Sequence, residues 1–174
     1  MKKRILSEKT VNQLTVDKME QLKYLKIKNE CLTRNEKGIF TNLATEFYIL
    51  SLFARMGVNA HLTLGQKKSV DIVVEKNDSI ITFDVKGLRG KTLWPLDNFV
   101  KIRNNHYIIL VSFVDKIFDL SLLPEIYVVP SKDVKKLMYQ NPKKSRKGIN
   151  LSLIREESNT LKYLNNWKFL SKQL

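Results

Sequence analysis

The chain has 174 residues, 43% of them hydrophobic, and its 31 Lys and Arg residues against 17 Asp and Glu residues give a formal net charge of +14. Such a chain is long enough for one domain with a buried core, and its composition argues against intrinsic disorder. No apolar run approaches the roughly 20 residues that span a bilayer, and the first residues lack the apolar segment of a secretory signal. The single Cys31 and the two distant histidines, His61 and His106, exclude an internal disulfide framework and a four-ligand Cys/His zinc site, so we expect a cytoplasmic protein.

The positive charge has two explanations. Basic proteins commonly bind an anionic partner, most simply nucleic acid. A codon bias towards Lys would give the same charge without any binding function, because surface lysines then only solvate the protein. The charge alone does not decide between these explanations.

Two helical segments are predicted in the first third of the chain. Residues 1–37 are polar and Lys-rich with apolar positions at loosely helical spacing, and we interpret them as an N-terminal helical extension to one domain formed by residues 38–174. A second helix is expected to begin at Gly38 and to end before Gly57, which suits the position after a helix end. Apolar residues recur in it at helical spacing, at Leu43, Phe47, Leu50 and Ala54. We therefore expect this helix, including Phe47 and Tyr48, to be largely buried.

Short β-type runs follow at residues 58–64, 70–75, 80–86, 107–113 and 126–130. Ser131 is expected to cap a short helix over residues 132–138. A basic stretch comes next, and the chain ends in an apolar-periodic segment with Leu161, Leu164, Trp167 and Leu170. A helix, antiparallel strands, a further strand and a helix predict a layered α/β or α+β fold.

The second and third runs form a predicted hairpin that carries two acids. If residues 76–79 are its loop and Glu75 faces Ile80, then Asp71 lies directly across from Asp84. Strand alternation then puts only apolar side chains on one face: Ile72, Val74, Ile81, Phe83 and Val85. Because like charges at opposed positions repel, this pairing favours a bound cation between the two carboxylates. Mg²⁺ prefers such oxygen ligands, and Lys86 on the same face could hold a water beside the metal.

These residues resemble the PD-(D/E)XK nuclease superfamily, in which a helix with a Glu precedes a hairpin with an Asp and then an (Asp/Glu)-x-Lys motif. The corresponding positions are Glu46, Asp71 and the triplet Asp84, Val85 and Lys86. The resemblance spans about residues 38–138 and departs from the family name at Val70, where proline would stand. It implies a restriction-endonuclease-like core, a central mixed β-sheet flanked by helices. It further implies that Asp71, Asp84, Glu46 and the Val85 carbonyl bind Mg²⁺, with Mn²⁺ as a substitute, and that Lys86 assists the attacking water.

Basic residues near this motif are candidates for DNA contacts. Arg89 and Lys91 follow Lys86 and could touch the phosphate backbone, although the same segment also reads as a solvated turn beside a core tryptophan, Trp94. A second cluster contains Lys143, Lys144, Arg146 and Lys147. An exposed helix and loop is the alternative interpretation of that stretch. His61 and His106 are expected to be structural histidines.

The leading hypothesis is an Mg²⁺-dependent endonuclease that hydrolyses DNA phosphodiester bonds with a metal-activated water. One alternative is a catalytically inactive module of the same fold that binds DNA or a protein partner, and another is a structural protein whose charge reflects codon bias. The sequence lacks G-x-x-x-x-G-K-[ST], so any ATP-driven step would need a partner. The short chain leaves little room for a recognition domain, which favours a homodimer or a helper subunit.

Overall fold

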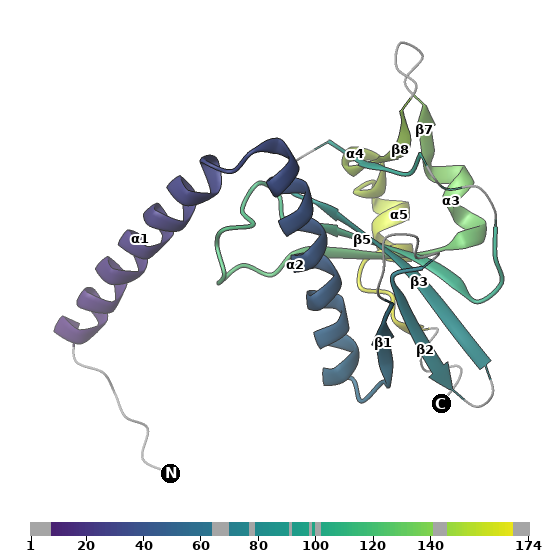
Figure 1. The fold of residues 1–174 in the computed structure, drawn as a ribbon, viewed down its shortest axis with the longest axis horizontal. Helices are drawn as coiled ribbons and strands as arrows, with labels where there is room; N and C mark the ends of the chain where they lie inside the picture. Colours follow the sequence, from purple (N-terminus) through teal and green to yellow (C-terminus); the bar gives the residue numbers. More distant parts are fainter. Residues whose placement is uncertain are drawn as a thin grey trace.

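The computed structural model describes residues 8–63, 70–76, 79–90, 92–97, 99, 102–140 and 146–168. Its helices are α1 (Glu8–Glu30), α2 (Arg34–Arg55), α3 (Ser131–Leu137), α4 (Leu151–Ile154) and α5 (Glu157–Tyr163). Its strands are β1 (Ala60–Leu62), β2 (Ile72–Lys76), β3 (Ser79–Leu88), β4 (Leu93–Pro95), β5 (His106–Ser112), β6 (Glu125–Pro130), β7 (Met138–Gln140) and β8 (Lys147–Asn150). In Figure 1, α1 extends away from the body that the other elements form.

The centre of the fold is a mixed five-stranded sheet in the order β1-β2-β3-β5-β6. β3 and β5 run parallel, whereas the other neighbours are antiparallel. Alternate residues of β5 belong to two separate clusters of buried side chains, so the sheet is covered on both faces. Helix α2 packs on one face, and α3, α4 and α5 contribute to the cluster on the other (Figure 1). This architecture confirms the predicted α/β class with a central mixed sheet flanked by helices and preceded by a helical segment.

Helix α2 begins four residues earlier than predicted. Thr33 is its N-cap and forms a capping box with Glu36, whose carboxylate accepts the Thr33 N–H at 2.8 Å. The expected start at Gly38 is therefore wrong, because the two capping side chains fix the first turn at Arg34. The helix ends as predicted, and Gly57 has a φ of 71°, the left-handed conformation that favours glycine at this position.

The buried face of α2 differs from the predicted one. Leu43 and Phe47 remain 44% and 57% exposed, so their expected burial is wrong. Tyr48 and Leu50 are half-buried and pack against the core. The residues that face the sheet are Thr41, Thr45, Ile49 and Phe53. The two threonines can be buried because each hydroxyl donates to a carbonyl one turn earlier in the same helix: Thr41 Oγ1 donates to the Lys37 carbonyl at 2.6 Å, and Thr45 Oγ1 to that of Thr41.

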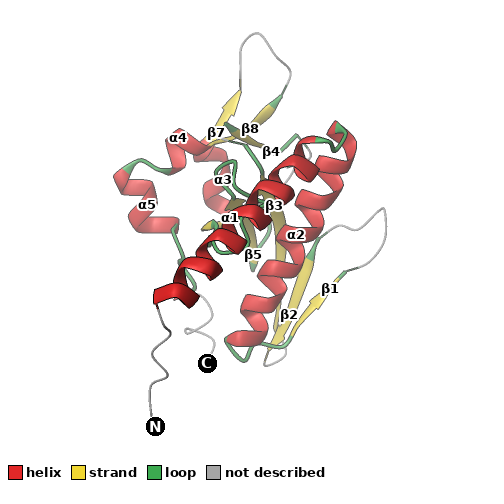
Figure 2. Cartoon of the chain, turned by 90° about the vertical axis from the view of Figure 1, so that its left-hand side faces the viewer, coloured by secondary structure: helices red, strands yellow, loops and turns green. Residues whose placement is uncertain are grey.

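A second sheet of three short strands, in the order β4-β8-β7, was not predicted. It lies above the main sheet in Figure 2, with β1 and β2 at the opposite end of the molecule. Trp94 of β4 is fully buried, and its indole Nε1 donates to the Val111 carbonyl at 3.1 Å. The interpretation of Trp94 as a core tryptophan is thus confirmed.

Smaller differences concern three other segments. β2 and β3 pair as far as Lys76 and Ser79, so the predicted four-residue hairpin loop is too long. Ser131 is the first residue of α3 rather than its cap, and its Oγ instead accepts the Arg103 backbone N–H at 3.1 Å. In the C-terminal segment, the helix ends at Tyr163 and Leu161 is 80% exposed, so Leu161 is not a core residue. Leu170 lies outside the described residues.

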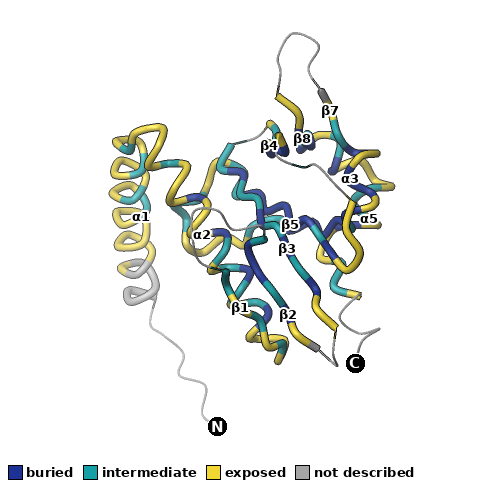
Figure 3. Tube along the Cα trace, turned by 45° about the vertical axis from the view of Figure 1, so that its right-hand side comes forward, coloured by how far each residue is buried: buried dark blue, intermediate teal, exposed yellow. Residues whose placement is uncertain are grey.

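Burial is greatest in the central sheet and least in the N-terminal helix. Figure 3 shows the inner strands β2, β3 and β5 largely buried or half-buried, and α1 largely exposed. No helix among the described residues is long and apolar enough to cross a membrane.

Candidate active site

The β2–β3 hairpin has the register that the sequence predicted. Ile72 faces Phe83 and Glu75 faces Ile80. The pairing ends just before Asp71 and Asp84, so their direct opposition stays a prediction. The Asp71 N–H donates to the Phe83 carbonyl at 2.8 Å, which holds Asp71 at the end of the strand. The five side chains of the apolar face are all buried. Since a slip of one residue would turn these side chains outwards, the core fixes the two acids on the other face.

Asp71 directly precedes β2, where β3 continues beyond its pairing with that strand. Asp71 Oδ2 accepts the Val85 backbone N–H at 2.7 Å, and its side chain is only 9% exposed. Lys86 Nζ lies 3.4 Å from Asp71 Oδ2 and 3.4 Å from the Val85 carbonyl oxygen. A positive group thus lies between two of the oxygens that the sequence assigned to a metal.

Asp84 is more open than Asp71, and its surroundings are also basic. Its Oδ2 lies 3.7 Å from His106 Nε2, and its side chain is 27% exposed. Burial acts to raise the pKa of Asp84, but His106, Lys86 and Arg103 act in the opposite direction and prevail, so the pKa lies below its ordinary value. Asp84 is therefore ionised at neutral pH and available as an anionic oxygen ligand.

His106 is a member of this site that the sequence did not identify. It is buried, it faces Thr82 across the parallel β3–β5 pair, and its Nδ1 lies 2.8 Å from Thr82 Oγ1. If the Thr82 hydroxyl donates to Nδ1, the ring proton is on Nε2, where it faces Asp84. The pairing of β3 with β5 brings these residues together, and no signal near His106 in the sequence indicates that pairing.

Glu46 lies on α2, next to the Thr45 that packs against the sheet, and is half-buried. Across the described ranges, no group of three or more His, Cys, Asp or Glu side chains is arranged to hold a metal ion. The role of Glu46 as a third acid of the site stays a prediction. The oxygens near Lys86 belong to Asp71 and Val85.

The basic residues assigned to DNA lie in different surroundings. Arg89, just after β3, donates to Thr41 Oγ1 at 3.1 Å, to Asn29 Oδ1 and to the Lys37 carbonyl at 3.4 Å, and so links α1 and α2 to the end of β3. Arg146 and Lys147 are exposed at the start of β8. Lys91, Lys143 and Lys144 lie outside the described residues. DNA contact by all six remains a prediction.

Comparisons with known proteins place the chain in no family. Neither the models of protein families nor the curated proteins give a match. Among solved structures, the chain is similar to that of a bacterial homing endonuclease, I-Ssp6803I, with 16% identical residues and a TM-score of 0.46. The similarity covers 80% of this chain and 93% of the other. A match at this level carries no argument about the function of this chain.

Proposed function

We propose that this protein is an Mg²⁺-dependent endonuclease that hydrolyses phosphodiester bonds of DNA. The observation that carries the proposal is that Lys86 Nζ, two residues after Asp84 on β3, lies 3.4 Å from both Asp71 Oδ2 and the Val85 carbonyl. Two acids and a lysine on one sheet face, on a body with a net charge of +14, suit a polyanionic substrate that a metal ion bridges to the acids.

The oxygen donors fit a hard divalent cation. Carboxylates of Asp71 and Asp84 and the carbonyl of Val85 would hold Mg²⁺ or Mn²⁺, with Glu46 as a further acid. The Lys86 ammonium lies between two of these oxygens, those of Asp71 and Val85, which supports the view that this site favours a positive charge. When bound, the metal would neutralise charge on the phosphodiester and activate the attacking water.

Other groups of the protein would orient the two acids and assist the attacking water. The Val85 N–H donates a hydrogen bond to the Asp71 carboxylate, and His106 lies against the Asp84 carboxylate, so both acids have fixed positions. Lys86 would donate to the attacking water and stabilise the negative charge of the transition state. Arg89, Lys91, Lys143, Lys144, Arg146 and Lys147 would contact the DNA backbone. A homodimer or a helper subunit would supply the recognition surface.

A plasmid-nicking assay tests this proposal. Supercoiled DNA is incubated with the protein and Mg²⁺ or Mn²⁺, with EDTA as the blank. We expect nicking that EDTA abolishes and that Asp84→Asn lowers by about 10²-fold or more. Glu75→Gln is the matched control, because Glu75 lies on the same hairpin face but is exposed and opposes Ile80. Equal cleavage by Asp84→Asn and the wild type would refute the assignment.

The ion pair between Lys86 and Asp71 also suits a module that binds DNA without cutting it. Lys86 lies beside the nearly buried Asp71, so this carboxylate has a counter-charge even without a metal. Tight, salt-dependent DNA binding without cleavage under every metal condition would favour this second function.

A further inference from the structure

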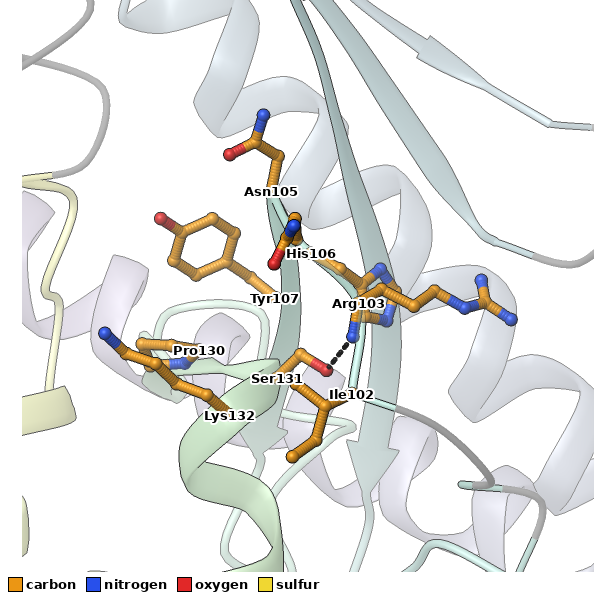
Figure 4. Close-up of a pocket in the computed structure, with 9 residues that line it drawn as sticks. Ile102, Arg103, Asn105, His106, Tyr107, Pro130, Ser131 and Lys132 are labelled. Carbon is orange, nitrogen blue, oxygen red and sulfur yellow. Dashed lines mark hydrogen bonds between the residues drawn. The ribbon is translucent and has the colours of Figure 1, made fainter.

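A pocket beside the acid pair is not explained by the metal site. Its volume is about 270 Å³, it lies at the start of β5 and the end of β6, and its lining residues are drawn in Figure 4. Arg103, Asn104, Asn105, His106 and Lys132 are among them, and none of the lining residues is acidic. The pocket therefore offers positive and amide donors without a competing carboxylate.

Hydrogen bonds to α3 and β3 hold the loop before β5, which forms one wall of the pocket. The Arg103 N–H donates to Ser131 Oγ of α3 at 3.1 Å, and the Asn105 carbonyl accepts the Thr82 N–H of β3 at 2.9 Å. Asn105 has a φ of 50°, which asparagine adopts more readily than most residues. The backbone of this wall is thus held in place before any ligand arrives.

His106 connects the pocket with the acid pair. The imidazole is part of the pocket lining, and its Nε2 lies 3.7 Å from Asp84 Oδ2. In Figure 4 the Arg103 guanidinium extends to one side, and the Tyr107 ring and the Lys132 ammonium lie on the other. The pocket therefore presents positive charge on both sides of the histidine that contacts Asp84.

The pocket is large enough for a single charged group with some of its water. At about 30 Å³ for each water in the liquid, the volume corresponds to roughly nine waters. Sites for whole small-molecule ligands commonly measure about 300–1,000 Å³. A phosphate with part of its hydration shell fits this space, and the positive and amide groups of the lining favour such an anion.

We propose that this pocket binds a backbone phosphate of the DNA strand, on the order of one or two nucleotides from the scissile phosphodiester, with Lys132 and the side-chain amides of Asn104 and Asn105 as donors. The proposal rests on the proposed function in that its ligand is the same DNA. His106 lines the pocket and its Nε2 lies 3.7 Å from Asp84 Oδ2, so a phosphate bound there would be a near neighbour of the scissile one.

Binding in EDTA tests the pocket separately from cleavage. Fluorescence anisotropy with a labelled DNA duplex gives Kd at several salt concentrations for the wild type and for Lys132→Ala. We expect a several-fold rise in Kd and a plot of log binding constant against log salt that is shallower by about 0.9. Lys135→Ala is the matched control, because Lys135 is exposed on the same helix but does not line the pocket, and its Kd should stay close to that of the wild type.

A second variant guards against a folding artefact. Asn105→Asp keeps the size of the side chain and its tolerance of positive φ, and adds a negative charge to the pocket. It should weaken DNA binding more than Lys132→Ala does, with a melting temperature near that of the wild type. If Lys132→Ala and Lys135→Ala weaken binding equally, or if Asn105→Asp binds as the wild type does, the pocket is not a phosphate site. If the two pocket variants behave as expected but the protein never cleaves DNA, the pocket inference stands and the endonuclease proposal fails.

Discussion

Replacing Gly87 by Ala should push α2 away from β3 next to the candidate site. Gly87 follows Lys86 directly, and a Cβ added to it would lie 2.8 Å from Thr41 Cγ2 and 3.2 Å from the Thr41 carbonyl oxygen, and would also collide with Thr45 Oγ1. Carbon atoms pack comfortably at about 3.5–4.0 Å, so α2 would have to move away by roughly 1 Å. The backbone oxygen cannot rotate out of the way.

The expected cost is that of an overpacked interface. Gly87→Ala should lower the free energy of unfolding by about 1–3 kcal/mol, which corresponds to a fall in melting temperature of roughly 2–12 °C for a chain of this size. Misplacement of catalytic groups by 1 Å can cost about 10²-fold in rate, so cleavage should fall more than stability alone explains. Urea unfolding, thermal melting and the plasmid assay measure these effects.

Gly38→Ala is the control in the same helix. Nothing lies within 4 Å of a Cβ at Gly38, so alanine should stabilise α2 by about 0.5–1 kcal/mol. Thr45→Ala in the Gly87→Ala background should recover part of the lost free energy, because it removes one of the colliding atoms. A Gly87→Ala protein as stable as the wild type would refute the close packing of α2 on β3.

Three further predictions address separate parts of the structure. Lys86→Met should lower cleavage by about 10²–10³-fold while DNA binding in EDTA changes little; equal losses of both would contradict its role beside the attacking water. The pKa of Asp133 lies below its ordinary value because the hydrogen bond and charge of Lys162, with help from Tyr163, outweigh the opposing effect of burial. The stability that Asp133 contributes is thus present above about pH 3.9 and lost as the pH falls through its lower folded-state pKa, so Asp133→Asn should flatten the pH dependence of unfolding below about pH 4, and an unchanged slope would contradict this. Trp94→Phe removes the indole donor to the buried Val111 carbonyl and should cost about 1–3 kcal/mol in urea unfolding; no loss would show that the bond contributes nothing.

The sequence predicted those features that local patterns determine. The alternation of apolar residues in the hairpin allows one register from Ile72 onwards, because any slip by one residue would expose Ile72 and Phe83. Gly57 indicated the end of α2 for a similarly local reason, its left-handed backbone.

Long-range packing determines the features that the sequence did not predict. The buried face of α2 depends on the space that Gly87 leaves for Thr41 and Thr45, so the more apolar stripe with Phe47 stays outside. The short strands β4 and β8 pair although more than 50 residues separate them, without any alternation to announce them. His106 joins the site through the parallel pairing of β3 with β5, which no local pattern fixes.

A crystal structure with Mn²⁺ tests most directly whether the hairpin acids hold the catalytic cation. We expect one ion within about 2.2 Å of an oxygen of both Asp71 and Asp84, located by its anomalous scattering, with the Lys86 ammonium displaced from its place between Asp71 and Val85. An ion bound elsewhere, or crystals soaked at high Mn²⁺ in which Lys86 still lies against Asp71 and no ion is present, would contradict it.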